Sequence, residues 1–398
     1  MQKHYDLIII GAGASGLFTS IESQKNLSKL ILEKNKTPGA KILLSGGERA
    51  NVSNIDIEPE RDYFGQNKKA LISMFNKFNN YDIISYFTEN GINITEEDRG
   101  RLLLESGNSK QLLDLLIKKS KQNKTDIIYN SRVIDILKNY IPLNKGELKG
   151  DFEISIENGD KYTCDKLVIT TGGKSFSHVG TTGDGYIWAK NFGHTIITPH
   201  RGLCSLVTKK DLTSISGVST DLKLEIISNI SKKTIYFEVG PLLFTHFGLS
   251  GPIIFNSSIA IGEYINSLDL TEFTSNLDFS KILENEKNDY ITRSFIKENI
   301  ILRLSFNLEK TPKRVVSFFN LNDENLKIDL ELQDYRTWKE AKVTGGGVKI
   351  DELTNNLESK LISGLYFAGE ILDITGKTGG YNLQFAWTSG YIVGRSLQ

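Results

Sequence analysis

The sequence predicts an α/β protein in which both ends of the chain form one discontinuous domain around an insertion. Residues 5–34 read as strand, glycine-rich turn, helix and strand. The continuous apolar run Leu7–Ile10 is typical of a strand that is buried on both faces of a parallel sheet. Glycine is scarce in the polar middle of the chain and returns in strength between Gly345 and Gly390. Two glycine-rich ends around a glycine-poor middle therefore indicate a domain that is built from both ends.

These changes of composition give the domain boundaries. We expect residues 1–198 and 336–398 to form the discontinuous domain and residues 199–335 to form the insertion. Short strand-like runs make residues 199–260 β-rich, whereas residues 261–335 read as polar and mixed helical.

Composition excludes several classes of protein. The 398 residues are 39% hydrophobic and 24% charged, as in an ordinary globular protein. Forty-eight basic residues balance 48 acidic ones, so we expect no general attraction to nucleic acid or to an acidic membrane, although a local basic patch is compatible with this balance. No apolar run is long enough to span a membrane, and the short apolar stretch at the start does not resemble a signal peptide. Cys164 and Cys204 are too few for a disulfide framework, so the expected compartment is the cytoplasm.

The first motif lies between the first strand and the first helix. Its glycines, Gly11, Gly13 and Gly16, have the GxGxxG spacing of a turn in which the backbone approaches a diphosphate. Ala14 and Ser15 begin the helix, whose N-terminus attracts anions. Glu33, 22 residues after Gly11, ends the second strand, where an acidic side chain binds ribose hydroxyls and repels a ribose 2′-phosphate. The alternative is a purely structural turn. The predicted nucleotide-binding residues are Gly11, Gly13, Ala14, Ser15, Gly16, Glu33 and the following Lys34.

The C-terminal segment favours FAD over NAD. Residues 364–370 form an apolar strand that ends in Gly369 and Glu370, as in flavoproteins whose last strand brings an acidic residue to the ribityl or diphosphate part of FAD. A simple NAD dehydrogenase has no reason to return to its first domain in this way. The glycine-rich residues 378–384 then lead into a helix whose N-terminus would stabilise negative charge on reduced flavin, the alternative being a structural loop before a packing helix. Its candidate cofactor residues are Gly380, Tyr381, Asn382 and Gln384.

A third motif, residues 41–51, follows the second strand. It should emerge at the carboxyl edge of the sheet, where ligands bind. Its candidate donors to flavin or diphosphate oxygens are Lys41, Ser45 and Asn51, and Gly46 is included with them. Arg49 is equally well explained as a structural ion-pair residue.

The chain resembles the HI0933-like or aminoacetone oxidase-like family of FAD-dependent oxidoreductases, which includes bile-acid dehydro-intermediate reductases. The resemblance rests on the strings just described and on four further stretches, residues 171–185, 243–252, 343–348 and 364–390. It implies an FAD-binding, Rossmann-like, two-dinucleotide-binding domain built from both chain ends, an inserted β-barrel-like domain and a small helical subdomain. It also implies that Thr171, Gly172 and Gly173 pack beside the dinucleotide and that Val133 offers backbone groups to adenine.

Two stretches depart from the family pattern. The family usually reads Gly-Gly-Gly-Arg-Cys-Asn where this chain has Gly46–Asn51, with Glu48 replacing a glycine and Ala50 replacing a cysteine. A catalytic cysteine at that point is therefore excluded. The family also tends to read Gly-Arg-Val-Phe-Pro where this chain has residues 100–104, a region that we expect on the substrate side.

The histidines and cysteines predict no further chemistry. The five histidines lack metal-ligand spacing, so no metal site is expected, and His246 is best explained as part of a structural turn. Neither cysteine has a CxxC partner. Asp184 is expected to cap or turn the chain into the following helix rather than to bind a ligand.

These observations predict an FAD-dependent oxidoreductase that acts on a small molecule. The first hypothesis is oxidation of a small amine, such as aminoacetone, with oxygen as acceptor. The alternative is reduction of an activated C=C bond in a hydrophobic acceptor, with NAD(P)H as a transient co-substrate, although no second complete GxGxxG marks a nicotinamide domain. An FAD-dependent RNA-modifying protein and a non-catalytic flavin-binding protein are lesser alternatives. Sequence alone predicts neither a catalytic acid or base nor an oligomeric state.

Overall fold

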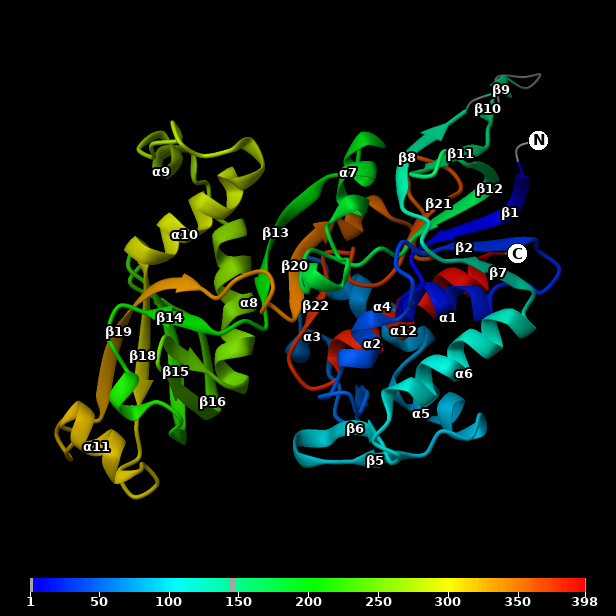
Figure 1. Cartoon of the computed structure of the whole chain (residues 1–398). Coiled ribbons are helices and arrows are strands. Elements are labelled where there is room, and N and C mark those ends of the chain that lie inside the picture. The colour runs from blue at the N-terminus through cyan, green and yellow to red at the C-terminus, as the bar shows by residue number, and fades with distance from the viewer. Residues whose placement is uncertain (1–2, 140, 143–147, 398) are drawn as a thin grey trace. The chain divides into compact units, whose positions relative to one another are not determined.

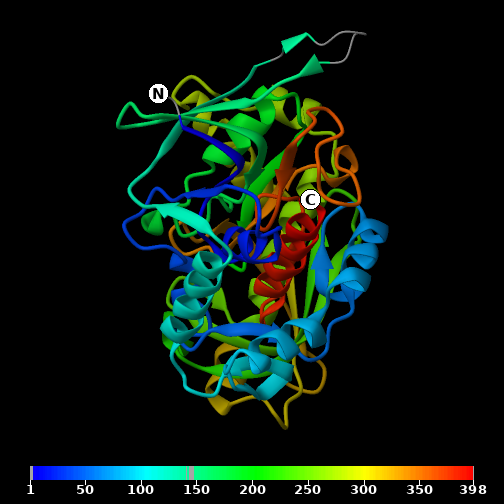
Figure 2. The ribbon, with the colours of Figure 1, turned by 90° about the vertical axis from the view of Figure 1, so that its right-hand side faces the viewer.

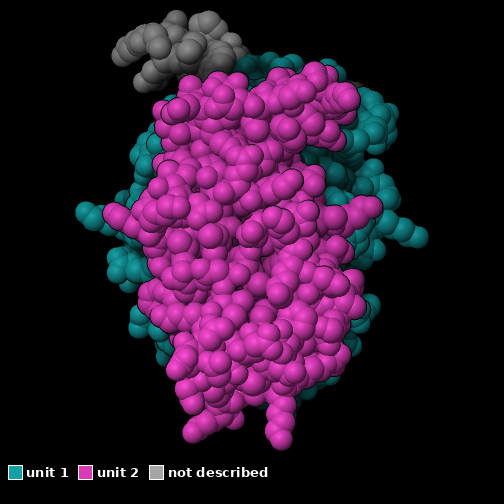
Figure 3. Space-filling model, turned by 90° about the vertical axis from the view of Figure 1, so that its left-hand side faces the viewer, with its two compact units in different colours: residues 1–197, 346–398 teal, residues 198–345 magenta. Residues whose placement is uncertain are grey.

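The computed structural model describes residues 3–139, 141–142 and 148–397 and divides into two compact units (Figure 3). Unit 1 comprises residues 1–197 and 346–398, and unit 2 comprises residues 198–345. Residues 336–345, which the sequence analysis placed in the discontinuous domain, lie in unit 2 because they pack there: the backbone N–H of Arg336 donates to the Ser205 carbonyl (2.9 Å), and Ala341 is fully buried in the core of that unit.

A seven-stranded sheet forms the centre of unit 1 (Figure 1). Its strand order is β7-β2-β1-β12-β11-β8, and β21 pairs with the second half of β12. The strands β7, β2, β1, β12 and β21 are parallel, whereas β11 runs antiparallel to both of its neighbours. The carboxyl ends of the parallel strands therefore lie at one edge of the sheet. The bounds are β1 (Lys3–Ile10), β2 (Lys29–Leu32), β7 (Thr125–Ile128), β8 (Val133–Lys138), β11 (Phe152–Ile156), β12 (Lys161–Ile169) and β21 (Leu365–Phe367).

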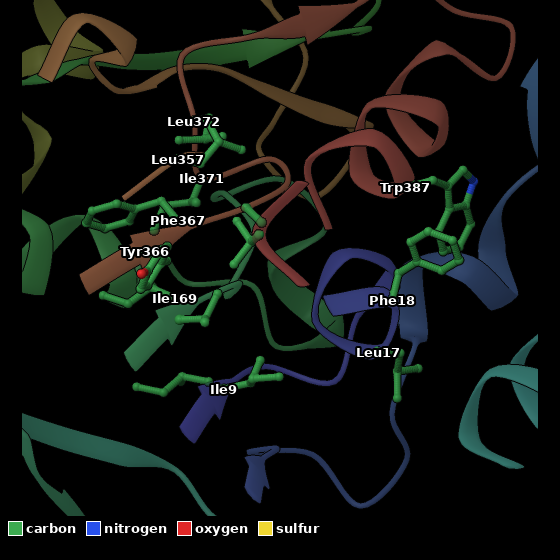
Figure 4. Close-up of a cluster of buried hydrophobic side chains, with 14 of the residues drawn as sticks. Ile9, Leu17, Phe18, Ile169, Leu357, Tyr366, Phe367, Ile371, Leu372 and Trp387 are labelled. Carbon is green, nitrogen blue, oxygen red and sulfur yellow. The ribbon is translucent and has the colours of Figure 1, made fainter. Parts of the chain in front are cut away.

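Two helices from opposite ends of the chain, α1 (Ala14–Glu22) and α12 (Tyr381–Ser396), pack side by side in this unit (Figure 2). Glycines on α12 allow the close approach: a Cβ at Gly390 would lie 2.8 Å from the Ser15 carbonyl oxygen. One turn further along, a Cβ at Gly394 would lie 2.8 Å from the carbonyl oxygen of Thr19. The rings of Phe18 and Trp387 then meet edge to face, with centroids 5.7 Å apart, inside the apolar cluster of Figure 4. The two ends of the chain thus share one core.

Shorter elements complete unit 1. Two small sheets, β3-β6-β5 and β22-β4, lie apart from the main sheet, and β9 pairs with β10. The remaining bounds are α2 (Ala40–Leu44), β3 (Asn51–Asn54), α3 (Pro59–Asp62), β4 (Tyr63–Phe64), α4 (Lys68–Lys77), α5 (Asn80–Glu89), β5 (Ile94–Glu96), β6 (Arg101–Leu104), α6 (Ser109–Gln122), β9 (Ile141–Pro142), β10 (Leu148–Lys149), α7 (Asp184–Asn191) and β22 (Thr375–Gly376).

Unit 2 contains a closed barrel of six antiparallel strands in the order β14-β17-β16-β15-β18-β19, which confirms the expected β-barrel. The stretch predicted as β-rich, 199–260, supplies β14–β17 and the start of helix α8, and the stretch predicted as mixed helical, 261–335, supplies α9, α10 and α11 together with β18 and β19. Buried and half-buried residues alternate along β18, as expected for a strand with one face in a core. The bounds are β14 (Leu206–Thr208), β15 (Ser219–Ser228), β16 (Thr234–Thr245), β17 (Gly248–Ser250), α8 (Pro252–Asn266), α9 (Thr271–Ser275), α10 (Lys287–Asn299), β18 (Ile300–Ser305), α11 (Lys313–Phe319) and β19 (Lys327–Tyr335).

The chain enters and leaves unit 2 through two paired strands, β13 (Ile196–Gly202) and β20 (Val343–Val348). The imidazole of His200 is buried between two glycines. A Cβ at Gly262 would lie 1.9 Å from its Cδ2 atom, and a Cβ at Gly345 would lie 2.2 Å from its Nε2 atom. Burial lowers the pKa of His200 to about 4, so the ring packs as a neutral group.

A buried lysine lies in the main sheet. Lys29, in β2, is 1% exposed, and its ammonium group donates to the Gln24 carbonyl oxygen at 2.8 Å. Loss of hydration lowers the pKa of Lys29 from 10.5 to about 8. Its charged form is therefore disfavoured in the folded protein.

Among the described residues, no helix is long and apolar enough to cross a membrane. No group of three or more histidine, cysteine, aspartate or glutamate side chains in the same part of the chain is arranged to hold a metal ion.

We expect Gly345→Ala to destabilise the protein by about 1–3 kcal/mol, because the added methyl group would overlap the His200 ring. His200→Ala should also destabilise it, by leaving a cavity. The double variant should lose at least about 1 kcal/mol less than the sum of the two single variants, since the smaller side chain makes room for the methyl group. Chemical denaturation of the four proteins measures this coupling, and additive losses would contradict it.

Lys29→Met should be more stable than the wild type at neutral pH, by on the order of 1–3 kcal/mol, because it removes a buried charge. The folded-state pKa of Lys29 lies below its unfolded value, so Lys29 is protonated in both states below about pH 8. At such pH the folded state carries the full free-energy penalty of burying the charged ammonium group. The penalty disappears as pH rises from about 8 to 10.5. The difference in unfolding free energy between the variant and the wild type should therefore shrink over that interval. A difference that is independent of pH would contradict this origin.

Candidate functional site

Four strand ends meet at the carboxyl edge of the main sheet. The backbone N–H of Gly11, after β1, donates to the last residue of β2, Leu32 (2.9 Å). After β12, Thr170 donates from its backbone N–H to the Ile10 carbonyl oxygen, also at 2.9 Å. The N–H of Ala368, after β21, donates to the last residue of β12 at 3.2 Å. These bonds bring the glycine turn, Glu33 and the loops that follow β12 and β21 to one place.

The three glycines of the first turn have different roles. Gly11 has a φ of +106°, and a Cβ there would lie 2.7 Å from the Thr170 carbonyl oxygen. A Cβ at Gly16 would lie 2.0 Å from the Gly11 carbonyl oxygen, so both of these glycines are required by close packing. A Cβ at Gly13, the residue that precedes α1, would have no described heavy atom within 4 Å. Gly13 therefore faces open space beside the N-terminus of α1, where the first N–H groups have no acceptor within the helix.

Glu33 is buried and holds the glycine turn. One of its carboxylate oxygens accepts from the Ala12 backbone N–H and the other from that of Asn35, each at 2.8 Å. Burial raises the pKa of Glu33 and these donors oppose the rise. A carboxylate has about four acceptor positions, so ribose hydroxyls can still bind here.

Lys34, predicted to contact the cofactor, lies against a different group. Its ammonium forms an ion pair with Asp184 at 3.3 Å and donates to the Thr182 hydroxyl at 2.9 Å. Asp184 begins helix α7, as expected, but it does not cap the helix, because Gly183 occupies the N-cap position. No sequence pattern indicates this pair, because its members are 150 residues apart.

Three side chains from three segments form a closed polar cluster, which we call the Lys41–Ser175–Glu370 cluster. Lys41, in α2, donates to the Ser175 hydroxyl (2.8 Å) and forms an ion pair with Glu370. Ser175 in turn donates to the other carboxylate oxygen of Glu370 (2.8 Å). Lys41 and Glu370 were both predicted at this site. Ser175 was missed, because it is a single serine at the end of a glycine motif.

The side chains of residues 45–51 are largely used within the protein. The Ser45 hydroxyl donates to the Ile42 carbonyl oxygen (2.8 Å) at the end of α2. Gly46 has a φ of +58°, and a Cβ there would lie 2.8 Å from the backbone nitrogen of Asn51. With its amide oriented so that the nitrogen faces acceptors and the oxygen faces donors, Asn51 donates to the Ser53 carbonyl oxygen (2.9 Å) and accepts from the Gly380 N–H (3.1 Å). Asn51 thus ties this loop to the C-terminal one.

The two departures from the family pattern differ in backbone conformation and burial. Glu48 and Ala50 adopt φ values of +71° and +55°, a backbone conformation that favours glycine by about 1 kcal/mol, which accounts for the glycine usual at position 48. Residues 102–104 are at most 4% exposed and form part of strand β6, so these three side chains are packed inside the protein.

The start of α12 presents backbone rather than side chains. Asn382 hydrogen-bonds to both the N–H (2.9 Å) and the carbonyl (2.7 Å) of Gly376. Gln384 is fully buried and pairs with Ser53 (2.6 Å) and with Thr388. The hydroxyl of Tyr381 donates to the Asp56 carbonyl oxygen (3.3 Å). These predicted side chains are thus hydrogen-bonded within the protein. The groups of α12 that can bind an anionic ligand are its first backbone N–H groups.

The remaining predicted residues lie near these groups. Val133 begins the edge strand β8 two residues after Ser131, whose N–H donates to the Glu33 carbonyl oxygen (2.9 Å). The hydroxyl of Thr171 is buried and has no hydrogen-bond partner within the described part of the chain. Gly172, at a φ of +73°, would place a Cβ 3.6 Å from a Glu370 carboxylate oxygen, and the buried Gly173 follows it. Gly369 has a φ of +80°, and a Cβ there would lie 2.5 Å from the Ser15 hydroxyl oxygen.

This arrangement fits a dinucleotide. It combines open space at Gly13, beside the N-terminus of α1, with a buried acid at Glu33. The fold and the site thus define a dinucleotide-binding protein of the flavoprotein type.

The comparisons with known proteins identify the family. Residues 5–396 match the family described as HI0933-like protein Rossmann domain, and the chain belongs to this family. It is therefore an FAD-dependent oxidoreductase with a Rossmann-type fold.

Named relatives extend over the whole chain. A ribosomal RNA dihydrouridine synthase of Escherichia coli is 30% identical, covering 99% of this chain and 98% of its own. A 3-dehydro-bile acid delta(4,6)-reductase of Clostridium scindens is 28% identical and covers 98% of both chains. Among solved structures, a 3-ketosteroid-delta4-(5alpha)-dehydrogenase from Rhodococcus jostii matches with a TM-score of 0.51 at 12% identity, over 99% of this chain and 97% of its own, which shows the fold alone.

Gly13→Val should abolish FAD binding while leaving the fold intact. The φ of −83° at Gly13 suits any residue, and no described atom would meet the Cβ, so the side chain would fill only the space that we assign to the diphosphate. The measurement is flavin content after purification together with the melting temperature of the apoprotein. Gly16→Val is the matched control and should lose stability as well, because its side chain would meet the Gly11 carbonyl oxygen. Normal flavin content in Gly13→Val would contradict the assignment.

Proposed function

We propose that this protein uses NAD(P)H to reduce a C=C bond that is conjugated to a carbonyl group, and that its acceptor is a uridine of ribosomal RNA. The observation that carries the proposal is the chemistry shared by the two named relatives. Uracil has a C5=C6 bond conjugated to its C4 carbonyl, and a delta(4,6)-reductase acts on double bonds in conjugation with a 3-keto group. Both names imply the same two-electron reduction in very different molecules.

The reaction balances without oxygen. NAD(P)H gives up a hydride, which reaches the carbon β to the carbonyl group, and a proton from solvent or a side chain adds to the α carbon. For uridine, the products are 5,6-dihydrouridine and NAD(P)+. Bound FAD supplies the hydride relay between the two substrates, neither of which needs to react with the other directly.

The residues of the site supply binding and electrostatics for this chemistry. The N–H groups at the start of α1 would hold the diphosphate, and Glu33 would hold the ribose while it also fixes the glycine turn. The first N–H groups of α12 favour negative charge, which increases on flavin when it accepts a hydride. The Lys41–Ser175–Glu370 cluster keeps an acidic side chain neutralised beside these groups.

RNA is favoured as the acceptor because a synthase that acts on it is 30% identical over almost the whole chain. A hydrophobic enone is the second candidate, supported by the bile-acid reductase at 28% identity. Amine oxidation, the first hypothesis from the sequence, ranks behind both, since the two sequence relatives described above are named for reductive chemistry. The zero net charge of the chain argues against general attraction to RNA and is compatible with recognition of a local RNA structure.

The experiment that tests the proposal separates the electron donor from the acceptor. The FAD-loaded protein is mixed anaerobically with NADH or NADPH, and we expect loss of the yellow colour of oxidised flavin. An unmodified ribosomal RNA fragment or a dienone steroid is then added to the reduced protein, and aminoacetone is added to a separate sample of the oxidised protein. The RNA should restore the colour, and mass spectrometry should detect a uridine that has gained two hydrogens.

The other outcomes are equally informative. If the dienone and not RNA restored the colour, the proposed acceptor would be wrong, and the proposed class of reaction would still hold. Bleaching by aminoacetone instead of NAD(P)H, with hydrogen peroxide formed in air, would contradict the proposal in favour of the oxidase. The flavin-free Gly13→Val variant is the control for non-enzymatic reaction.

A further inference from the structure

We propose that His194 is a positioning residue for the cofactor site: as a neutral imidazole it holds strand β21 in place, and protonation of its ring loosens this strand and weakens FAD binding. The loop that follows β21 carries Gly369 and Glu370 at the carboxyl edge of the main sheet. His194 is not among the residues of that edge, so it acts through β21. The proposal rests on FAD binding and not on the identity of the electron donor or acceptor.

The His194 side chain is fully buried between two polar partners. Its Nδ1 atom lies 3.0 Å from a carboxylate oxygen of Glu352, and its Nε2 atom lies 2.7 Å from the hydroxyl oxygen of Ser359. These partners follow His194 by 158 and 165 residues, whereas the backbone N–H of His194 donates to the Ala189 carbonyl oxygen of α7 (3.0 Å). The ring therefore joins the end of α7 to the segment that precedes β21.

The hydrogen bonds of Ser359 determine which ring nitrogen carries the proton. The Ser359 hydroxyl oxygen accepts from the backbone N–H groups of Leu361 (3.1 Å) and Ile362 (2.9 Å), which occupies both of its acceptor positions. The hydroxyl hydrogen is then donated to Nε2 of His194, so the ring proton lies on Nδ1. From Nδ1 the ring donates to Glu352. Both nitrogens of a neutral imidazole are thus satisfied.

A second proton on the ring disrupts this arrangement. The imidazolium carries hydrogen on both nitrogens, and its Nε2–H group would meet the Ser359 oxygen, whose acceptor positions are already occupied. Burial also lowers the pKa of His194 below its ordinary value of 6.5, although the hydrogen bond to Glu352 opposes this shift. Since the folded-state pKa is the lower one, the arrangement loses stability as pH falls below 6.5.

The charge of a protonated ring would be compensated mainly by Glu352. Although burial raises the pKa of Glu352, hydrogen bonds from Thr195 and His194 hold it below its usual value, so this side chain is a carboxylate at neutral pH. It lies on the Nδ1 side of the ring and cannot replace the missing acceptor at Nε2. The other charged side chains of the adjoining segments have different partners or are exposed: Asp351 accepts from Asn67, Lys360 donates to the Asp351 carbonyl oxygen, Glu358 accepts from the Gly364 N–H, Lys349 interacts with Asp373, and Lys190 is exposed.

The segment that His194 fixes runs along β21. The ring meets Phe367 of this strand edge to face, with centroids 5.0 Å apart. The Ser359 backbone N–H donates to the Leu365 carbonyl oxygen (2.7 Å), and the Phe367 N–H donates to the Leu357 carbonyl oxygen (3.2 Å). Phe367 and Leu357 both belong to the buried cluster of Figure 4. Movement of Ser359 would therefore displace β21 and the cofactor loop that follows it.

The test is the pH dependence of FAD binding by the full-length protein. Titration of the apoprotein with FAD gives dissociation constants at about pH 5.5 and about pH 7.5, and we call their quotient the acid ratio. A single proton with a pKa of 6.5 after release can raise the dissociation constant by at most about tenfold over this interval, and we expect an acid ratio of about three to five in the wild type. Asp373, whose pKa burial raises to about 6, titrates in the same interval, so variants have to isolate the effect of His194.

Three variants identify the origin of the acid ratio. His194→Gln cannot take up the proton, so it should have a much smaller ratio than the wild type. Ser359→Ala removes the oxygen that opposes an Nε2–H group, so the charged ring is better tolerated and the ratio should fall to about two or less. Glu352→Gln removes the counter-ion of the charged ring, so the ratio should rise toward about ten. A merely structural role would weaken binding equally at both pH values and leave the ratio unchanged.

His4 provides the matched control. Its ring also lies between a hydroxyl and a carboxylate, those of Thr163 (3.0 Å) and Asp165 (3.7 Å), but its side chain is 49% exposed. His4→Gln should therefore keep the wild-type acid ratio. Melting temperatures of the apoproteins at both pH values show whether any variant has lost its fold. If His194→Gln has, the opposite effects of Ser359→Ala and Glu352→Gln decide the question.

The proposal is wrong if folded His194→Gln keeps the wild-type acid ratio, or if the affinity of the wild type does not change with pH. Ratios that change in the same direction in Ser359→Ala and Glu352→Gln would also contradict it. These measurements require neither NAD(P)H nor RNA, so their outcome is independent of the proposed reaction.

Discussion

The contact between α1 and α12 is the constraint on which the rest of unit 1 depends. Gly390 and Gly394 bring the backbone of the last helix against that of the first, with Phe18 and Trp387 packed alongside. Because the two helices share one core, β21 can pair with β12, and its carboxyl end lies beside the glycine turn. The 148 residues of unit 2 leave and rejoin this domain through paired strands, so the insertion need not interrupt the core.

Acidic side chains are unusual partners for a diphosphate, yet two of them lie at this sheet edge. Each is provided with its own donors. Glu33 receives two backbone N–H groups, one of them from the glycine turn itself, whereas Glu370 receives an ammonium and a hydroxyl. The carboxylates can therefore stay close to an anionic ligand and order the loops around it. In this site the N–H groups, the ammonium and the hydroxyl that hold the loops in place also compensate the charge of the two carboxylates.

Sequence reasoning succeeded where backbone geometry determines the residue. The spacing of Gly11, Gly13 and Gly16 follows from steric limits that any dinucleotide turn shares, and the family string at the C-terminus identified the returning strand. It could not assign side chains whose partners lie far away in the chain, such as Lys34 with Asp184 or Gln384 with Ser53. Strands β18 and β19 were not predicted individually, although buried residues alternate with more exposed ones along both, because that stretch was interpreted from its overall polar composition.

The core and the cofactor edge of unit 1 have different tolerances to change. The leucines of β6 replace the residues usual in the family and are buried against β3, where Leu103 pairs with Asn51 of the predicted cofactor loop, so that departure alters the packing behind this loop. Glu48 instead lies in the cofactor loop at a backbone angle that favours glycine, and this strain is sustained by the contacts around it, including the hydrogen bond from the Ser109 N–H to the Glu48 carbonyl oxygen (3.0 Å). A cradle here means the cofactor loops that backbone contacts hold in place. Such a cradle can be combined with many different electron acceptors with little change in its own residues. The same cradle can therefore serve relatives whose named substrates are as different as a ribosomal RNA and a bile acid.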